Sequence, residues 1–276
     1  MDRVSLGNAI AGRLQSEIAT AQAEFDQPGQ VPTSILDNVL EPSTCSAVHA
    51  AFPDPATMME RRTIRERKYV AAQMDRYDPL LEEAVYAFQQ PRVVEALSQI
   101  TGIRDLVPDE RLYAGGVSLM GRDNFLNPHI DNSHNDDRTG YRVLNLLYYV
   151  TPDWEESYGG SLQLWDRGLR QPSRTIESRF NRLVVMGTTP RSWHSVTPIV
   201  HDGSRCCVSN YYFAPRPLAS GTGYAGQEYF HVTKFRGFPE ERLKDVVLRG
   251  DATLRTAVRK VRRQGLVATR HIYRNQ

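Results

Sequence analysis

The sequence predicts an α+β fold, a β-barrel with helices before and after it in the chain. Apolar residues recur at helical spacing up to about residue 105, and strand-like alternation then replaces it until helical spacing returns after Pro217. With 276 residues, 40% of them hydrophobic, the chain is long enough to bury its own core. We expect a single domain with a helical part over residues 1–105, a barrel core over about 110–215 and a basic helical extension over 216–276.

The N-terminal part is predicted to be mainly helical. Leu6, Ile10 and Leu14 recur every fourth residue and predict a first helix, which Pro28-Gly29 would end. A short strand and a turn are expected next, followed by three more helices; these elements cover residues 31–40, 43–51, 80–88 and 93–100. Gly102 is expected to close the last of these helices.

Seven strands are predicted for the barrel core, separated by turn signals such as Gly159-Gly160 and Asp202-Gly203. They cover residues 112–120, 142–150, 161–165, 174–176, 182–186, 193–198 and 205–213. Many short strands at this spacing are typical of a sandwich or a barrel. After them, a Gly-rich stretch is expected to lead into a final helix that contains Leu254, Ala257, Val258 and Val261 on one face.

Charge and cysteine content exclude several classes of protein. Lys+Arg 34 against Asp+Glu 32 gives a net charge of +2, too small to indicate nucleic-acid or membrane binding. The basic residues between 255 and 274 are interpreted as a solvated helix face and tail, with a site for an acidic partner as the alternative. Three cysteines without a Cys-x-x-Cys pair, and no visible signal peptide, predict a cytoplasmic protein. The oligomeric state is left open.

The most informative segment is His129-Ile130-Asp131. Residues i and i+2 of a strand point the same way, so both side chains can reach one metal ion. His194 is the best third ligand, because it opens a strand, whereas His134 and His201 lie in a polar loop and a turn where exposure is expected. Two imidazoles and one carboxylate form the facial triad of non-haem Fe(II) oxygenases. A chance His-x-Asp without a metal is the alternative for this motif.

A candidate anion site lies on the last strand. Strand parity places Arg205 on the same face as Tyr211, and it places Asn145 on the same face as Tyr149 in a neighbouring strand. An arginine and a tyrosine hydroxyl that converge would bind a carboxylate, because the guanidinium pairs with it in a bidentate manner and never loses its charge. The alternative for Arg205 is an ordinary arginine at a strand edge.

The order of these motifs resembles the Fe(II)/2-oxoglutarate-dependent dioxygenases, in particular their prolyl-hydroxylase-like branch. The resemblance runs from about residue 31 to residue 213 and rests on five elements in the family's order. These are His129-Ile130-Asp131, the Tyr148-Tyr149 strand, Gly159-Gly160, His194 and Arg205. The fold that it implies is a double-stranded β-helix, or jelly-roll, barrel.

The resemblance also implies roles. His129, Asp131 and His194 would hold Fe(II), and Arg205 with Tyr149 would bind the distal carboxylate of 2-oxoglutarate. Asn145 is a further candidate for co-substrate binding, and ascorbate is the candidate reductant. The implied reaction is hydroxylation of an unactivated C–H bond with molecular oxygen, with succinate and CO2 as co-products. The chain departs from the family at Met120, where a Tyr is common, and at Ser195, where a Gly is common.

Two other functions compete with a hydroxylase. One is a non-catalytic, cupin-like metal-binding or sensing module, in which the same residues are structural. The other is a metal-dependent hydrolase or isomerase, which would not need Arg205 and Tyr149 as an anion site. The substrate, a small molecule or a peptide, is not identified by the sequence. Four aromatic residues either line its pocket or pack in the core: Trp154, Trp165, Tyr211 and Tyr212.

Overall fold

The computed structural model describes residues 1–218 and 231–261. Its helices are α1 (Arg3–Ser16), α2 (Ile18–Phe25), α3 (Pro42–Ala50), α4 (Pro79–Ala87), α5 (Pro91–Thr101) and α6 (Arg242–Val261). The strands of the N-terminal half are β1 (Thr33–Asp37), β2 (Met59–Arg62), β3 (Glu66–Ala71), β4 (Val107–Pro108), β5 (Gly116–Met120) and β6 (Phe125–Ile130). The remaining strands are β7 (Tyr141–Tyr149), β8 (Leu162–Leu164), β9 (Arg174–Ile176), β10 (Arg182–Gly187), β11 (His194–Val196), β12 (Arg205–Ala214) and β13 (Lys234–Phe235).

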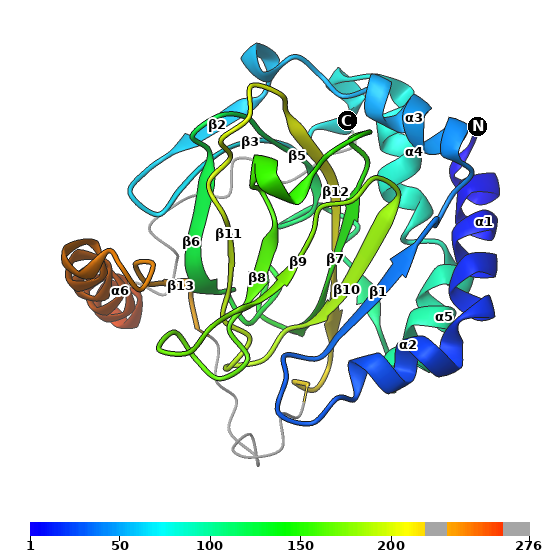
Figure 1. Cartoon of the computed structure of the whole chain (residues 1–276). Coiled ribbons are helices and arrows are strands. Elements are labelled where there is room, and N and C mark those ends of the chain that lie inside the picture. Colours follow the sequence, from blue (N-terminus) through cyan, green and yellow to red (C-terminus); the bar gives the residue numbers. More distant parts are fainter. Residues whose placement is uncertain (219–230, 262–276) are drawn as a thin grey trace.

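Within the described residues, the strands form one curled antiparallel sheet with the order β1-β10-β7-β12-β5-β3-β6-β11-β8-β9 (Figure 1). Three short strands lie off this path: β2 pairs with β3, β4 with β12, and β13 with β6. β6 and β11 lie on one side of the curled sheet, and β7, β10 and β12 lie on the other side. The sheet therefore encloses an interior between these two groups of strands. This is the jelly-roll architecture with flanking helices that the sequence predicted.

Helices α1 to α5 cover one side of the sheet (Figure 1). Leu6, Ile10 and Leu14 of α1 are buried, as their spacing predicted. Asp2 caps α1 by accepting a hydrogen bond from the Ser5 amide. Gly102 ends α5 with a φ of 67°, a left-handed conformation that costs glycine little. The helices predicted over residues 43–51, 80–88 and 93–100 therefore exist.

The central strands separate two cores, as strand parity predicted. On β12, Cys206, Val208 and Tyr212 belong to the core that packs against the helices. Cys207, between them, belongs to a second core inside the barrel, together with Tyr149 of β7. Tyr212 is thus a packing residue, with its hydroxyl donating to the Phe88 carbonyl. Arg205 shares the parity of Cys207, so its side chain starts on the barrel side.

Two strand regions escaped prediction. β6 carries Asn127 and Pro128, which weaken the strand pattern. The side-chain amide of Asn127 donates to the Ile64 carbonyl, and the Pro128 carbonyl accepts from the Arg236 amide, so tertiary contacts hold the strand. The β2–β3 hairpin lies in the charged stretch 60–68, where cross-strand ion pairs replace apolar alternation. In addition, β5 starts at residue 116 rather than 112.

The C-terminal part crosses to the other side of the barrel (Figure 1). β13 adds to β6, and α6 follows it. Asp251 of α6 pairs with Arg65 near the β2–β3 turn, and Asp245 pairs with Arg236, so ion pairs fix this helix to the sheet. The Gly-rich stretch and the basic tail beyond 261 lie outside the described residues, and the structure describes no side chains from 256 onward in α6. No described helix is long and apolar enough to cross a membrane.

Candidate active site

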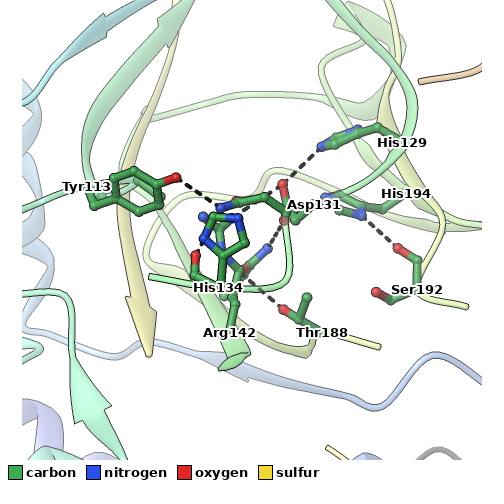
Figure 2. Close-up of polar contacts among 12 residues, drawn as sticks. Tyr113, His129, Asp131, His134, Arg142, Thr188, Ser192 and His194 are labelled. Carbon is green, nitrogen blue, oxygen red and sulfur yellow. Dashed lines mark hydrogen bonds and ion pairs between the residues drawn. The ribbon is translucent and has the colours of Figure 1, made fainter. Parts of the chain in front are cut away.

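Three potential metal ligands meet inside the barrel. His129 at the end of β6 and His194 at the start of β11 are direct cross-strand partners, and their ring centroids lie 4.0 Å apart. Asp131 follows β6 and places its two carboxylate oxygens 3.6 Å from His129 Nε2 and 3.6 Å from His194 Nε2 (Figure 2). Among the described residues, this is the one group of three or more His, Cys, Asp or Glu side chains that could hold a metal ion, with all ligand atoms within 4.8 Å.

Backbone carbonyls orient both imidazoles. His129 Nδ1 lies 2.9 Å from the Asn127 carbonyl oxygen, and His194 Nδ1 lies 2.9 Å from that of Ser192. A carbonyl only accepts, so each Nδ1 carries the proton and each Nε2 presents a lone pair toward Asp131. Burial, and then the neighbouring His194, lower the pKa of His129 to about 3, which keeps this ring neutral. Phe235 of β13 stacks on the His129 ring at 5.2 Å and covers it.

The Asp131 carboxylate is held by two residues of β7. Burial alone would raise its pKa, but the Arg142 guanidinium and the two imidazoles keep that pKa below its ordinary value. Arg142 Nη1 lies 3.4 Å from Oδ1, and the Asn145 side-chain amide donates to Oδ2 at 2.6 Å. Thr188 donates in turn to the Asn145 oxygen at 3.3 Å. The carboxylate is therefore ionised and oriented, as a metal ligand must be.

Asn145, a candidate for co-substrate binding in the sequence, thus contacts Asp131 in the structure. Both polar ends of its amide are engaged, by Asp131 and by Thr188. Its position on the barrel face agrees with the parity prediction. We assign it a positioning role toward the carboxylate ligand.

A second polar site lies where β5, β7 and β12 meet. Arg205 is 4% exposed, and its Cζ lies 5.2 Å from the centroid of the Tyr149 ring. Its Nη2 donates to the Met120 sulfur at 3.0 Å, while its Nε has no hydrogen-bond partner. Tyr149 Oη faces Arg205 and Ser178, yet it forms no hydrogen bond of standard geometry. Burial raises the pKa of Tyr149, so its hydroxyl stays protonated and can donate.

These two sites fit Fe(II) and 2-oxoglutarate. Two neutral imidazoles and a carboxylate are the donor set of a facial triad, which leaves three coordination positions for other ligands. The buried Arg205 has no carboxylate within ion-pair distance among the described residues, and Tyr149 Oη is a buried donor with no acceptor. Buried polar atoms are rarely left unsatisfied, so this site is suited to the carboxylate of a bound molecule.

The structure places one buried arginine beside the triad that the sequence did not identify. Arg142 is 5% exposed, pairs with Asp131, and places its Cζ 4.5 Å from the centroid of the Tyr211 ring. Strict alternation from Asn145 would put residue 142 on the opposite face. The register of β7 against β12 shifts opposite Tyr212 and Phe213, and this bulge turns Arg142 inward.

The rival histidines lie outside the metal cluster. His134 was expected in a solvated loop, and this prediction was wrong: the residue is 4% exposed and forms a β-bridge with Tyr141. Its backbone carbonyl accepts from Asn132, whose amide also donates to Tyr113. The loop that contains His134 is therefore held in place beside the metal ligands by these hydrogen bonds and the β-bridge. His201 is partly buried and stacks on Tyr158 with centroids 3.8 Å apart.

A jelly-roll barrel that holds two histidines, one aspartate and a buried arginine without a carboxylate partner is typical of a non-haem iron oxygenase. Comparison with protein families agrees, because residues 115–213 match the model of the 2OG-Fe(II) oxygenase superfamily. Residues 115–213, which contain the residues of both sites, are therefore similar to this superfamily, and the relatives and solved structures that match the chain include prolyl hydroxylases. The cofactors of the superfamily are Fe(II) and 2-oxoglutarate, and both sites fit them.

Two curated relatives that match part of the chain are prolyl 3-hydroxylases. The chain is 30% identical over 151 residues to the mouse prolyl 3-hydroxylase OGFOD1, covering 48% of this chain and 27% of that protein. It is 38% identical over 86 residues to the Xenopus laevis enzyme of the same name, covering 29% of this chain and 16% of that protein. The chain thus matches about a quarter or less of the length of these relatives.

Solved structures share the fold. A prolyl-4-hydroxylase from Pseudomonas putida aligns with a TM-score of 0.53 at 18% identity, over 71% of this chain and 99% of that one. A Trichoplax adhaerens prolyl hydroxylase, solved with a peptide of the hypoxia inducible factor oxygen degradation domain, aligns with a TM-score of 0.51 at 21% identity. That alignment covers 72% of this chain and 91% of the other.

Proposed function

We propose that this protein hydroxylates an unactivated C–H bond of a prolyl residue in a peptide, with 2-oxoglutarate and O2 as co-substrates and succinate and CO2 as co-products. The observation that carries the proposal is the pairing of the triad His129, Asp131 and His194 with the unpaired donors of Arg205 and Tyr149. The prolyl substrate is supported by the names of the relatives. A small-molecule substrate is the alternative to a peptide.

In this proposal, bound Fe(II) and 2-oxoglutarate supply the oxidising power, and the chain supplies position. His129, Asp131 and His194 hold the metal, with their orientations fixed by the Asn127 and Ser192 carbonyls and by Asn145. Arg205 and Tyr149 bind the distal carboxylate of the co-substrate. The apolar barrel core around Tyr149 excludes water from that end, which strengthens the ion pair.

Asp131 also bears on the outcome of the reaction. Halogenases of this superfamily have a small residue at the position of the carboxylate ligand, which leaves room for a halide. Here a carboxylate occupies that place, and Arg142 and Asn145 hold it there. Hydroxylation is therefore favoured over halogenation.

The test is an assay of the purified chain with Fe(II), 2-oxoglutarate, ascorbate and proline-containing peptides. We expect succinate that depends on both Fe(II) and O2, and a peptide whose mass increases by one oxygen. Free proline and other small molecules form a second arm of the assay, which separates peptide from small-molecule substrates. The His129→Ala variant is the matched negative control, since it removes one of the three ligands.

A non-catalytic, cupin-like module is the competing function. Such a module would bind the metal and still form no succinate under any of these conditions. Metal-dependent hydrolysis or isomerisation would turn over substrate without O2 and without 2-oxoglutarate. Either result would overturn the proposed hydroxylase.

A further inference from the structure

Met120 lies directly against the arginine of the proposed co-substrate site. It is the last residue of β5 and the cross-strand partner of Arg205 at the start of β12. Side chains of directly paired residues share a face and lie close enough to interact. Met120 is 1% exposed, and its sulfur accepts a hydrogen bond from Arg205 Nη2 at 3.0 Å.

The rest of the Arg205 side chain is held by apolar contacts. Gly160 has a φ of 76°, and a Cβ atom added to it would lie 3.1 Å from Arg205 Cδ. The glycine therefore packs closely against the aliphatic part of the Arg205 side chain. The Tyr149 ring lies beside the guanidinium, whose Nε has no partner. The guanidinium of Arg205 is thus fixed at Nη2 by the Met120 sulfur, while its Nε–H has no hydrogen-bond partner among the described residues.

A thioether suits this position because it is an uncharged and weak acceptor. A carboxylate here would pair with Arg205 and compete with any dicarboxylate ligand. A purely apolar side chain would leave the arm at Nη2 without a partner in a buried site, which is costly. The sulfur lies between these extremes, since it orients the guanidinium and leaves its charge uncompensated.

We propose that Met120 is a positioning residue for co-substrate binding: its sulfur orients the Arg205 fork toward the distal carboxylate of 2-oxoglutarate. The proposal rests on the proposed function, because it takes 2-oxoglutarate as the ligand of Arg205. It predicts that the acceptor atom at residue 120, and not only the volume of the side chain, determines affinity for 2-oxoglutarate.

The experiment compares substitutions at residue 120 in the full chain. Equilibrium binding of 2-oxoglutarate is measured by calorimetry on protein loaded with Mn(II), so that the readout does not depend on turnover. Met120→Leu keeps an apolar side chain of similar size without an acceptor, and we expect it to weaken binding roughly two- to tenfold. Met120→Gln places an amide oxygen on a chain of similar length, so it should bind 2-oxoglutarate more tightly than Met120→Leu.

A third variant tests the charge. Met120→Glu should weaken binding by about thirtyfold or more, because its carboxylate pairs with Arg205 in place of the ligand. Met74→Leu is the matched control, since Met74 is fully buried in the helix-facing core, and it should leave 2-oxoglutarate binding unchanged. Mn(II) affinity, measured for every variant, verifies that the barrel is folded.

The order of the variants decides the outcome. If only packing mattered, Met120→Leu would bind as the wild-type protein does and better than Met120→Gln, and this order would overturn the positioning role. The Arg205 Nε–H resonance in NMR spectra gives a ligand-free readout: it should broaden in Met120→Leu, and an unchanged signal would contradict the proposal. If the wild-type protein itself failed to bind 2-oxoglutarate, or if Arg205→Ala bound it equally well, the proposed function would fail instead.

Discussion

Arg142 and Arg205 are both buried in the barrel, yet they differ in what neutralises them. Arg142 lies beside the metal ligands, with its Nη1 3.4 Å from the Asp131 carboxylate. Arg205 has no carboxylate within ion-pair distance among residues 1–218 and 231–261, and it contacts a sulfur and an aromatic ring. The difference separates two uses of the same side chain. A buried charge paired within the chain can orient a ligand residue, whereas a buried charge without such a partner is suited to bind an anion that the chain does not supply.

The largest effect is expected from breaking the ion pair between Arg142 and Asp131. Asp131→Ala leaves Arg142 as a buried charge without its carboxylate, which should lower the free energy of unfolding of the metal-free protein by about 3–5 kcal/mol. Urea unfolding measures the change. The double variant Asp131→Ala/Arg142→Met should recover most of the loss, because it removes the stranded charge. A double variant no more stable than Asp131→Ala would show that the ion pair is not the cause.

Arg205→Met tests the arginine that has no carboxylate partner. Its effect on the free energy of unfolding should have the opposite sign. Without ligand, the variant should be at least as stable as the wild-type protein, because no carboxylate of the described chain loses its partner. Its affinity for 2-oxoglutarate should fall about thirtyfold to several thousandfold, corresponding to roughly 2–5 kcal/mol. Arg205→Lys should recover part of this affinity, since the charge returns without the fork. Calorimetry with bound Mn(II) measures both variants, and loss of Mn(II) binding would indicate a folding defect.

Asn145→Ala tests whether the hydrogen bond from Asn145 to Asp131 supports metal binding. The variant removes the 2.6 Å hydrogen bond to Asp131 and leaves all three ligands in place. Residues that orient metal ligands typically contribute 10- to 100-fold to metal affinity, so we expect a loss in this range. A competition assay with a metal-binding dye measures it. If metal affinity were unchanged and 2-oxoglutarate affinity were reduced, Asn145 would instead contribute to co-substrate binding, as the sequence predicted.

The smallest effect is expected from Tyr149→Phe. A single hydrogen bond to the distal carboxylate is lost, so 2-oxoglutarate binding should weaken by about 1–3 kcal/mol while metal affinity stays constant. Tyr148→Phe is the matched control, because this neighbouring tyrosine points to the helix side and donates to Asn181 at 2.7 Å. Equal losses in the two variants would mean that Tyr149 does not contact the co-substrate.

Regular strands made much of the site predictable. On β12 and β7, side chains alternate between the two cores over most of the strand, so parity alone assigns Arg205 and Tyr149 to the barrel face. Arg142 was not predictable in this way, because a bulge near the start of β7 changes the face to which it points. β6 was missed because Pro128 and Asn127 interrupt its pattern, and contacts with distant segments stabilise it.

The pairing of β13 with β6 has a consequence for how the protein assembles during synthesis. β3 covers one edge of β6 at Phe125 and Leu126, but the same edge at His129 and Ile130 is covered by β13, which is synthesised long after it. Until Phe235 leaves the ribosome, the backbone beside a histidine of the triad is an open strand edge, which can pair with other chains. Nascent chains that end before β13 should therefore be the aggregation-prone species.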